Sequence, residues 1–286
     1  MNLTKRVLVT GAGGYIGRFV VAELLDGGHN VVAVSSDTSR VDSRALRIET
    51  DLFSLNNYAP EEILVKLGNP DICLHLAWKD GFVHNADSHM EMLSAHYKFL
   101  KKITEGGGVK QLAVMGSMHE VGYYNGKIDE DTPCNPISLY GIAKDSLRRS
   151  LLLMANAKDL VFQWLRGFYV LGDDINNKSV FSKIMQAEEE GKEFFPFTTG
   201  KNRYDFIEVT ELAKQIALCI TQENVNGIIN CCSGMPVSLA DRVEQFIQEK
   251  GLKIKLQYGI YPDRPYDSPE VYGDNSKIKT ILKTRN

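Results

Sequence analysis

The sequence predicts an α/β fold in which a doubly wound parallel sheet is covered by helices on both faces. Three observations lead to this prediction. Short apolar runs rich in β-branched residues alternate with helical patterns through most of residues 1–172. A glycine-rich loop joins the first strand to the first helix. The chain has 286 residues, 43% of them hydrophobic and 24% charged, and this composition is typical of a globular protein with a sizeable core.

The first unit of this pattern predicts a dinucleotide site. A strand, a glycine-rich loop and a helix follow one another in residues 6–25, and a second strand follows at 31–34. Gly11, Gly14 and Gly17 form a GxxGxxG spacing between the first strand and the first helix. Glycines let the backbone turn tightly and approach a pyrophosphate, which binds to the free N–H groups at the helix N-terminus. The order of elements around the motif is the context in which it has this meaning.

The alternation continues along the chain and weakens after Gly172. Further strands are expected at 46–48, 71–77, 109–115, 161–165, 194–198, 227–231 and 253–258, and further helices at 60–67, 88–105, 141–153, 179–191, 212–221, 238–250 and 274–282.

Composition excludes several classes of function. The net charge of −3, without a basic tract, gives no reason to expect a nucleic-acid partner. No apolar run reaches the roughly 20 residues that cross a bilayer, and no signal-peptide pattern precedes the first strand. Five cysteines show neither a CxxC pair nor metal-ligand spacing, so no metal is expected. Their odd number and one vicinal pair indicate reduced thiols and a cytoplasmic protein.

Tyr140 and Lys144 form the main candidate for chemistry. They stand four residues apart, at the start of a predicted helix that Ser138 can cap. Side chains at i and i+4 lie on the same helix face. A cation held one turn away is expected to lower the pKa of the phenol, which is about 10 when unperturbed. Such a tyrosine can give a proton to a carbonyl oxygen or take one from an alcohol.

The glycine spacing together with the downstream YxxxK resembles the short-chain dehydrogenase/reductase superfamily, in particular its extended branch of sugar-nucleotide enzymes. The resemblance covers essentially the whole chain. It implies a Rossmann-like core with the catalytic residues at 1–172 and a mainly substrate-binding region at 173–286, with segments near 204–232 returning to the core. It also implies a nucleotide-diphosphate sugar as substrate, and a homodimer is common in this superfamily.

The cofactor is expected to be NADP(H). Ser35 and Ser36 end the second strand where NAD-binding proteins usually have an acidic residue, and Arg40 follows. Hydroxyls and a guanidinium suit a 2′-phosphate, although Asp37 leaves NAD(H) open. By resemblance, Asp51 and Leu52 contact the adenine. The other cofactor-binding residues that the resemblance implies are Tyr15, Ile16, Leu76, Ala77 and Trp78, together with Tyr140 and Lys144.

Ser117 is expected to complete the catalytic set. It stands 23 residues before Tyr140, at the end of a strand, where the resembling family has a serine or threonine that hydrogen-bonds the substrate oxygen. Relatives that dehydrate sugar nucleotides have an Asp-Glu pair directly after this residue, whereas this chain has Met118-His119. The helix at 88–105 lacks the asparagine that often supports the lysine, so that support is expected to come from elsewhere.

Four further residues are substrate-binding candidates by resemblance. His119 follows the catalytic serine, and Tyr169 stands where the family usually has an asparagine. Arg203 begins a segment similar to the family's RDF motif. Arg264 begins an R-P-x-D segment, whose guanidinium suits a diphosphate.

Taken together, these features predict NADPH-dependent reduction of the 4-keto group of a nucleotide-linked 4-keto-6-deoxy sugar. The alternative within the same class is an NAD-dependent nucleotide-sugar 4-epimerase, which would use the same three catalytic residues. A regulator that senses NADP(H) without turnover is a third reading, and it is disfavoured because both Tyr140 and Lys144 are present.

Overall fold

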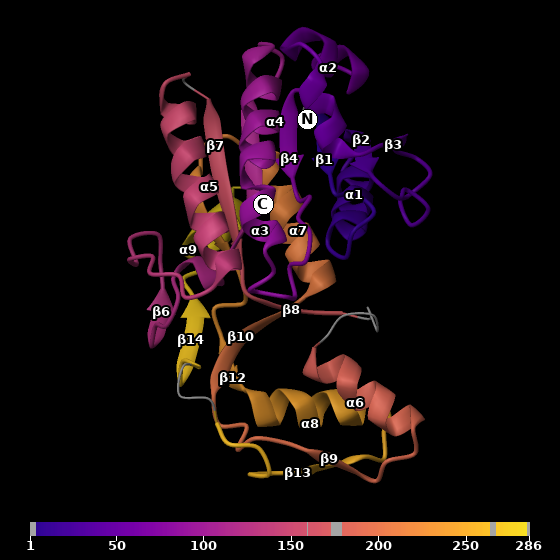
Figure 1. The fold of residues 1–286 in the computed structure, drawn as a ribbon, viewed down its shortest axis with the longest axis vertical. Helices are drawn as coiled ribbons and strands as arrows, with labels where there is room; N and C mark the ends of the chain where they lie inside the picture. Colours follow the sequence, from indigo (N-terminus) through magenta and orange to yellow (C-terminus); the bar gives the residue numbers. More distant parts are fainter. Residues whose placement is uncertain (1–3, 159, 173–178, 264–266, 285–286) are drawn as a thin grey trace.

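A seven-stranded, entirely parallel sheet forms the larger part of the molecule (Figure 1). The computed structural model describes residues 4–158, 160–172, 179–263 and 267–284. The strand order is β11-β7-β5-β4-β1-β2-β3, so the chain starts in the middle of the sheet and winds outward in both directions. The strands are β1 Arg6–Thr10, β2 Asn30–Ser35, β3 Leu46–Glu49, β4 Ile72–His75, β5 Gln111–Ser117, β7 Val161–Gly167 and β11 Gly227–Cys231.

Helices cover both faces of this sheet, and each face has its own apolar core. On one face, side chains of α1, α7 and α9 pack against the sheet. On the other face, α2, α4 and α5 do so. Because both faces are covered, central strands such as β1 and β4 are apolar without alternation. The helices are α1 Gly17–Asp26, α2 Pro60–Lys66, α4 Leu93–Glu105, α5 Leu139–Asn156, α7 Val209–Ile220 and α9 Ser276–Lys283.

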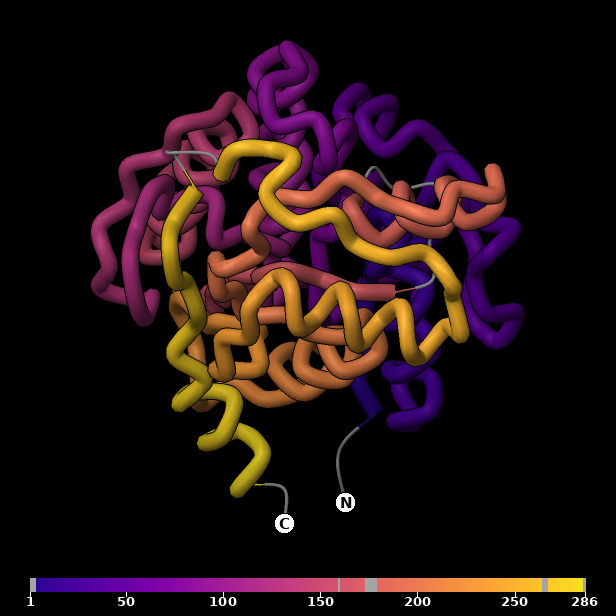
Figure 2. The backbone as a smooth tube through the Cα atoms, turned by 90° about the horizontal axis from the view of Figure 1, so that it is seen from below, coloured from indigo at the N-terminus to yellow at the C-terminus, as the bar shows by residue number. Residues whose placement is uncertain are grey.

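A smaller unit lies beyond one end of the large sheet, in the lower half of Figure 1. It contains a sheet with the order β12-β10-β14-β6, to which β8 adds by pairing with β10. A third, two-stranded sheet pairs β9 with β13, and Figure 2 shows these distant segments side by side. The elements of this unit are β6 Gly126–Ile128, β8 Tyr169–Leu171, α6 Val180–Glu189, β9 Phe194–Pro196, β10 Arg203–Glu208, β12 Pro236–Ser238, α8 Leu239–Glu249, β13 Lys255–Gln257 and β14 Glu270–Gly273.

The parallel sheet with helices on both faces confirms the predicted fold class. The helix expected at 88–105 is divided at Met92 into α3 Ser88–Glu91 and α4. β6, β8, β10, β12 and β14 were not predicted as strands. All of them except β10 have only three or four residues, which carry little periodicity. Two 3₁₀ turns, η1 Leu52–Asn57 and η2 Met118–Glu120, complete the list. Within the described part of the chain, no helix has the length and apolarity needed to span a membrane.

Candidate active site

A cavity of about 2160 Å³ lies between the large sheet and the smaller unit. Its wall includes residues that directly follow the carboxyl ends of β1, β2, β4 and β7, together with Ser117 at the end of β5. In open parallel sheets, ligands bind at this edge, where the strand order reverses direction. The cavity therefore occupies the position expected for the substrate and cofactor of such a fold.

The glycine-rich loop forms one end of the cavity, and its glycines are required by close backbone contacts. Gly11 has a φ of +68°, which is unfavourable for other residues. A Cβ on Gly17 would lie 2.2 Å from the carbonyl oxygen of Gly11, and a Cβ on Gly13 would lie 2.0 Å from that of Asp37. Ile16 and Gly17 line the cavity, so α1 begins at its wall, and no side chain caps this helix end. This cradle fits the pyrophosphate of a dinucleotide cofactor.

Polar side chains surround the cavity next to β2 and β3. Ser35 and Ser36 line it, as do Asp51 and Leu52. Glu49 also lines the cavity; it is paired with Ser35 across the sheet. Its carboxylate accepts hydrogen bonds from the backbone N–H (3.2 Å) and hydroxyl (3.1 Å) of Thr38. The carboxylates of Glu49 and Asp51 therefore lie at this end, beside the hydroxyls of Ser35 and Ser36.

The three catalytic candidates meet at the other end of the cavity. Ser138 caps α5 by accepting from the N–H of Gly141 at 3.2 Å, and this cap fixes the first turn that carries Tyr140. The side chains of Tyr140 and Ser117 both line the cavity, and Ser117 is buried at the end of β5. Burial raises the pKa of Tyr140 to about 12, and the neighbouring hydroxyl of Ser117 opposes this rise. The phenol is therefore protonated at neutral pH and can act as a proton donor.

Lys144 is held by groups other than an asparagine. Its ammonium donates to the carbonyl oxygen of Met115 at 2.7 Å and lies 3.7 Å from the centre of the Trp78 ring. Burial lowers the pKa of Lys144 to about 7, so the ammonium is easily neutralised at this position. We expected Lys144 to lower the pKa of Tyr140. The net shift of the Tyr140 pKa is upward instead, because desolvation of the phenol dominates.

Three histidine rings lie around Tyr140, those of His84, His89 and His119. The ring of His84 stacks on that of Tyr140 with centroids 5.5 Å apart, and the rings of His84 and His119 are 4.2 Å apart. The N–H of Tyr140 also donates to the carbonyl of His84 at 2.8 Å, which ties the loop before α3 to the catalytic helix. Burial lowers the pKa of His119 to about 3, with a smaller contribution from His84. The imidazoles of His84 and His119 are therefore neutral near pH 7.

Most residues proposed from the sequence line this one cavity. Two do not: Arg40 is exposed and absent from the wall, and Arg203 forms an ion pair with Glu270 at 2.8 Å and donates to the carbonyl of Pro236. Arg264 lies outside the described residues. Those that line the cavity are Gly11, Gly14, Tyr15, Ile16, Gly17, Ser35, Ser36, Asp51, Leu52, Leu76, Ala77, Trp78, Ser117, His119, Tyr140, Lys144 and Tyr169.

Sequence reasoning missed several neighbours of the reactive groups. Glu49 was not considered, although an acidic residue at the end of a strand next to β2 is a recognisable signal. The contact of Trp78 with Lys144 had no signal, since 66 positions separate the two residues. His75, expected to be a satisfied core histidine, is buried and bonded to Thr10 and His96, each at 2.8 Å.

Comparisons with known proteins agree with this geometry. The model of the NAD dependent epimerase/dehydratase family matches residues 7–232. The chain is 44% identical, over 271 residues, to a dTDP-6-deoxy-L-talose 4-dehydrogenase (NAD(+)) of Aggregatibacter actinomycetemcomitans, covering 93% of this chain and 98% of the relative. It is 28% identical to UDP-arabinose 4-epimerase 1 of Arabidopsis thaliana, covering 96% of this chain and 74% of the relative.

Solved structures show the same fold. MoeE5 in complex with UDP-glucuronic acid and NAD superposes with a TM-score of 0.80 and 26% identity, covering 97% of this chain and 92% of MoeE5. A UDP-glucose 4-epimerase from Thermotoga maritima has a TM-score of 0.80 at 23% identity, covering 96% of this chain and 91% of the epimerase. With a matching family model, a cradle for a dinucleotide and Tyr140 beside Ser117, the chain belongs to the NAD dependent epimerase/dehydratase family of extended short-chain dehydrogenases/reductases and is an oxidoreductase.

Proposed function

We propose that this protein interconverts the 4-hydroxyl and 4-keto forms of a nucleotide-linked 6-deoxyhexose, working in the cell as a 4-keto reductase. The observation that carries the proposal is the placement of Ser117, Tyr140 and Lys144 together in the wall of a cavity that also contains the glycine cradle. The relative with 44% identity is named for dehydrogenation at the same carbon of a dTDP-linked 6-deoxy sugar. Dehydrogenation and reduction are one reaction read in opposite directions, so both need the same groups.

In this proposal Tyr140 is the general acid, and a nicotinamide cofactor, when bound, would supply the hydride. The phenol is protonated at neutral pH, as the reduction requires, and gives its proton to the oxygen at carbon 4. The hydroxyl of Ser117 bonds the same oxygen and fixes its position. Lys144 holds the cofactor ribose and, when charged, favours loss of the phenolic proton.

The residues after Ser117 support reduction over dehydration. Removal of water from a sugar needs an acid and a base in contact with the substrate. Met118 and His119 line the cavity here, whereas Glu120 has no exposed surface and is not part of the wall. In this proposal the neutral His119, whose ring centre is 6.4 Å from that of Tyr169, binds sugar hydroxyls instead.

For the cofactor we propose NAD(H) as the preferred form. Ser35 and Ser36 alone favour NADP(H), and that prediction still has to be tested. The carboxylate of Glu49 next to Ser35 would repel a 2′-phosphate, and Arg40 does not line the cavity. The same relative carries NAD(+) in its name.

The test is turnover of dTDP-4-keto-6-deoxy sugars with NADH and with NADPH, followed by nicotinamide absorbance, with the product identified by NMR. We expect oxidation of NADH and a 4-hydroxy product of single configuration. If the protein instead interconverts the two 4-hydroxy epimers without consuming added cofactor, the 4-epimerase is correct. Faster turnover with NADPH would restore the prediction made from Ser35, Ser36 and Arg40.

A further inference from the structure

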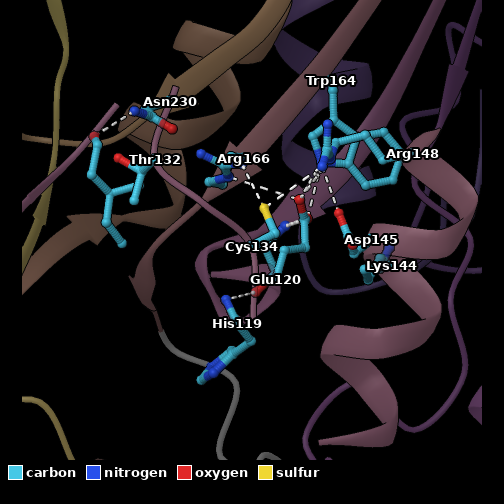
Figure 3. Close-up of polar contacts among 12 residues, drawn as sticks. His119, Glu120, Thr132, Cys134, Lys144, Asp145, Arg148, Trp164, Arg166 and Asn230 are labelled. Atoms are coloured by element: carbon cyan, nitrogen blue, oxygen red, sulfur yellow. Dashed lines mark hydrogen bonds and ion pairs between the residues drawn. The ribbon is translucent and has the colours of Figure 1, made fainter. Parts of the chain in front are cut away.

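Behind the catalytic residues lies a buried cluster of charged side chains that takes no part in the proposed chemistry (Figure 3). Its centre is Glu120, whose surface is 0% exposed. The carboxylate accepts from the backbone N–H of Ser117 at 2.5 Å and from the indole N–H of Trp164 at 2.8 and 2.9 Å. The guanidinium groups of Arg148 and Arg166 lie 3.6 and 3.8 Å from it.

The contact with Ser117 by itself has a local explanation. Ser117 and Glu120 form a capping box around η2, and such a box occurs at many helix starts. A capping box does not require complete burial, an indole donor or two cations. Placing a carboxylate without exposed surface is costly unless its charge is matched. The capping box therefore does not account for the burial of Glu120, for its contact with Trp164 or for the two arginines.

The cluster connects the elements that carry the catalytic groups. Ser117 ends β5, Arg166 belongs to β7, and Arg148 belongs to α5. Tyr140, Lys144 and Arg148 follow one another at intervals of four residues, so they form one stripe along α5. The carboxylate of Glu120 thus binds Ser117 on one side and the continuation of the Tyr140 stripe on the other.

We propose that Glu120 is a positioning residue, which holds Ser117 against Tyr140 and supplies a fixed negative charge behind Lys144. The proposal rests on the function proposed above. Glu120 touches neither the cavity nor the reacting atoms, and it acts through the backbone N–H of Ser117 and through its charge.

The contacts of Glu120 favour its ionised form over its protonated form. Burial raises the pKa of this carboxyl, and Arg166, the Ser117 N–H, Trp164 and Arg148 oppose the rise. All four contacts are donors, and a protonated carboxyl would need an acceptor for its hydrogen. The other charged and titratable groups of the cluster are Asp145, which accepts from Arg148 at 2.5 Å, and Cys134, whose sulfur lies 3.6 Å from Arg148 and 3.8 Å from Arg166.

The charge of Glu120 acts in one direction on both catalytic groups. It raises the pKa of Lys144 and that of Tyr140. Reduction needs a protonated tyrosine and is aided by a charged lysine, so the rate should fall as pH rises through these pKa values. Removing the charge of Glu120 should therefore move this alkaline limb to lower pH.

Two variants of the full-length protein separate the reach of the side chain from its charge, with NADH and the dTDP-4-keto-6-deoxy sugar as substrates. Glu120→Asp keeps the charge but withdraws the carboxylate from Ser117. We expect kcat to fall about 100-fold, with the KM for NADH within about twofold of wild type and the alkaline limb unmoved. Glu120→Gln keeps an oxygen for Ser117 but loses the charge. We expect its alkaline limb to move down by about one pH unit.

Asp205→Asn is the matched control. Asp205 is also 0% exposed and accepts from the N–H groups of Ser233, Gly234 and Gly273 at 2.8–3.0 Å, in the smaller unit. Its loss should lower the melting temperature without moving the alkaline limb. The proposal is overturned if Glu120→Asp keeps kcat within threefold, or if Glu120→Gln has the pH profile of wild type.

A second readout needs no turnover. In protein labelled with [ε-¹³C]lysine, the signal of Lys144 can be assigned by its loss in Lys144→Met, and its titration followed by NMR. Its midpoint should lie at lower pH in Glu120→Gln than in wild type or Asp205→Asn. Equal midpoints would overturn the proposal even if the true substrate is another sugar, and a difference would support it even if Glu120→Gln is inactive. Failure of the wild type in the turnover assay would count against the proposed function alone.

Discussion

The two ends of the cavity are built in different ways. At the end near β1, recognition depends on backbone, because the glycines leave room where a side chain would collide with Gly11 or Asp37. At the end near β5, the reactive groups are side chains, and each is held by a partner from another element. A side-chain atom added at the first end should therefore impair cofactor binding, and a polar atom removed at the second end should impair turnover.

Removal of one oxygen at the second end should have the largest effect. Tyr140→Phe keeps the ring against His84 and loses the proton donor, so kcat for the ketone should fall about 10³-fold. The Kd for NADH, measured by its fluorescence, should stay within about threefold of wild type. A variant with more than a tenth of wild-type turnover would mean that another group supplies the proton.

Addition of one methyl group at the first end should come next. In Gly17→Ala, the new Cβ would lie 2.2 Å from the carbonyl of Gly11, so the loop must move away from the helix N-terminus. We expect the Kd for NADH to rise about 10- to 100-fold, and kcat at saturating NADH to change far less. Gly27→Ala, at the other end of α1 and outside the cavity wall, is the control, because a Cβ there comes no closer than 3.3 Å to any atom. Equal Kd values for both variants would show that the cradle does not bind the cofactor.

The smallest effect should be on stability, and it should come from the buried pair His75 and His96. His75 and His96 are buried and bonded to each other, and burial lowers the pKa of both, that of His96 to about 3. Below pH 6.5 the unfolded chain binds protons that the folded protein does not. As pH is lowered below 6.5, the free energy of unfolding should therefore fall by about 1.4 kcal/mol for each pH unit and each histidine.

Urea denaturation at pH 7.0 and 5.5 measures this dependence. His96→Phe keeps the stacking on Trp78, whose ring centre is 4.5 Å from that of His96. Because one titrating histidine is removed, the free energy of unfolding should fall less on acidification, by the contribution of one bound proton. An unchanged pH dependence in His96→Phe would show that His96 is already charged in the folded protein.

Much of the fold could be predicted because its signals are local. A buried strand, a glycine loop and an amphipathic helix can each be recognised within about ten residues. The spacing of Ser117, Tyr140 and Lys144 can likewise be recognised in the sequence, because Ser117 ends a strand and the other two residues are one turn apart on a helix. The predicted cavity residues from 11 to 78 follow consecutive strands, whose carboxyl ends necessarily share one edge of the sheet.

What could not be predicted depends on which distant residues meet. Nothing near Lys144 in sequence indicates that its ammonium lies against the ring of Trp78, or that the carbonyl oxygen of Met115 accepts a hydrogen bond from it. Arg203 was proposed for the substrate because its segment is similar to a motif of the family, yet its neighbour across the sheet is Glu270. Glu120 follows directly after residues that were examined, but its role depends on Trp164 and Arg166, which belong to another strand.

The positions of the two tryptophans make intrinsic fluorescence a probe of both the cavity and the buried cluster. The chain has only two: Trp78 lies in the cavity wall beneath the lysine ammonium, and Trp164 is completely buried beside Glu120. One indole is open to quenching by anything that enters the cavity, and the other is shielded from it. Intrinsic fluorescence can thus distinguish events in the cavity from rearrangements behind it, without any attached label.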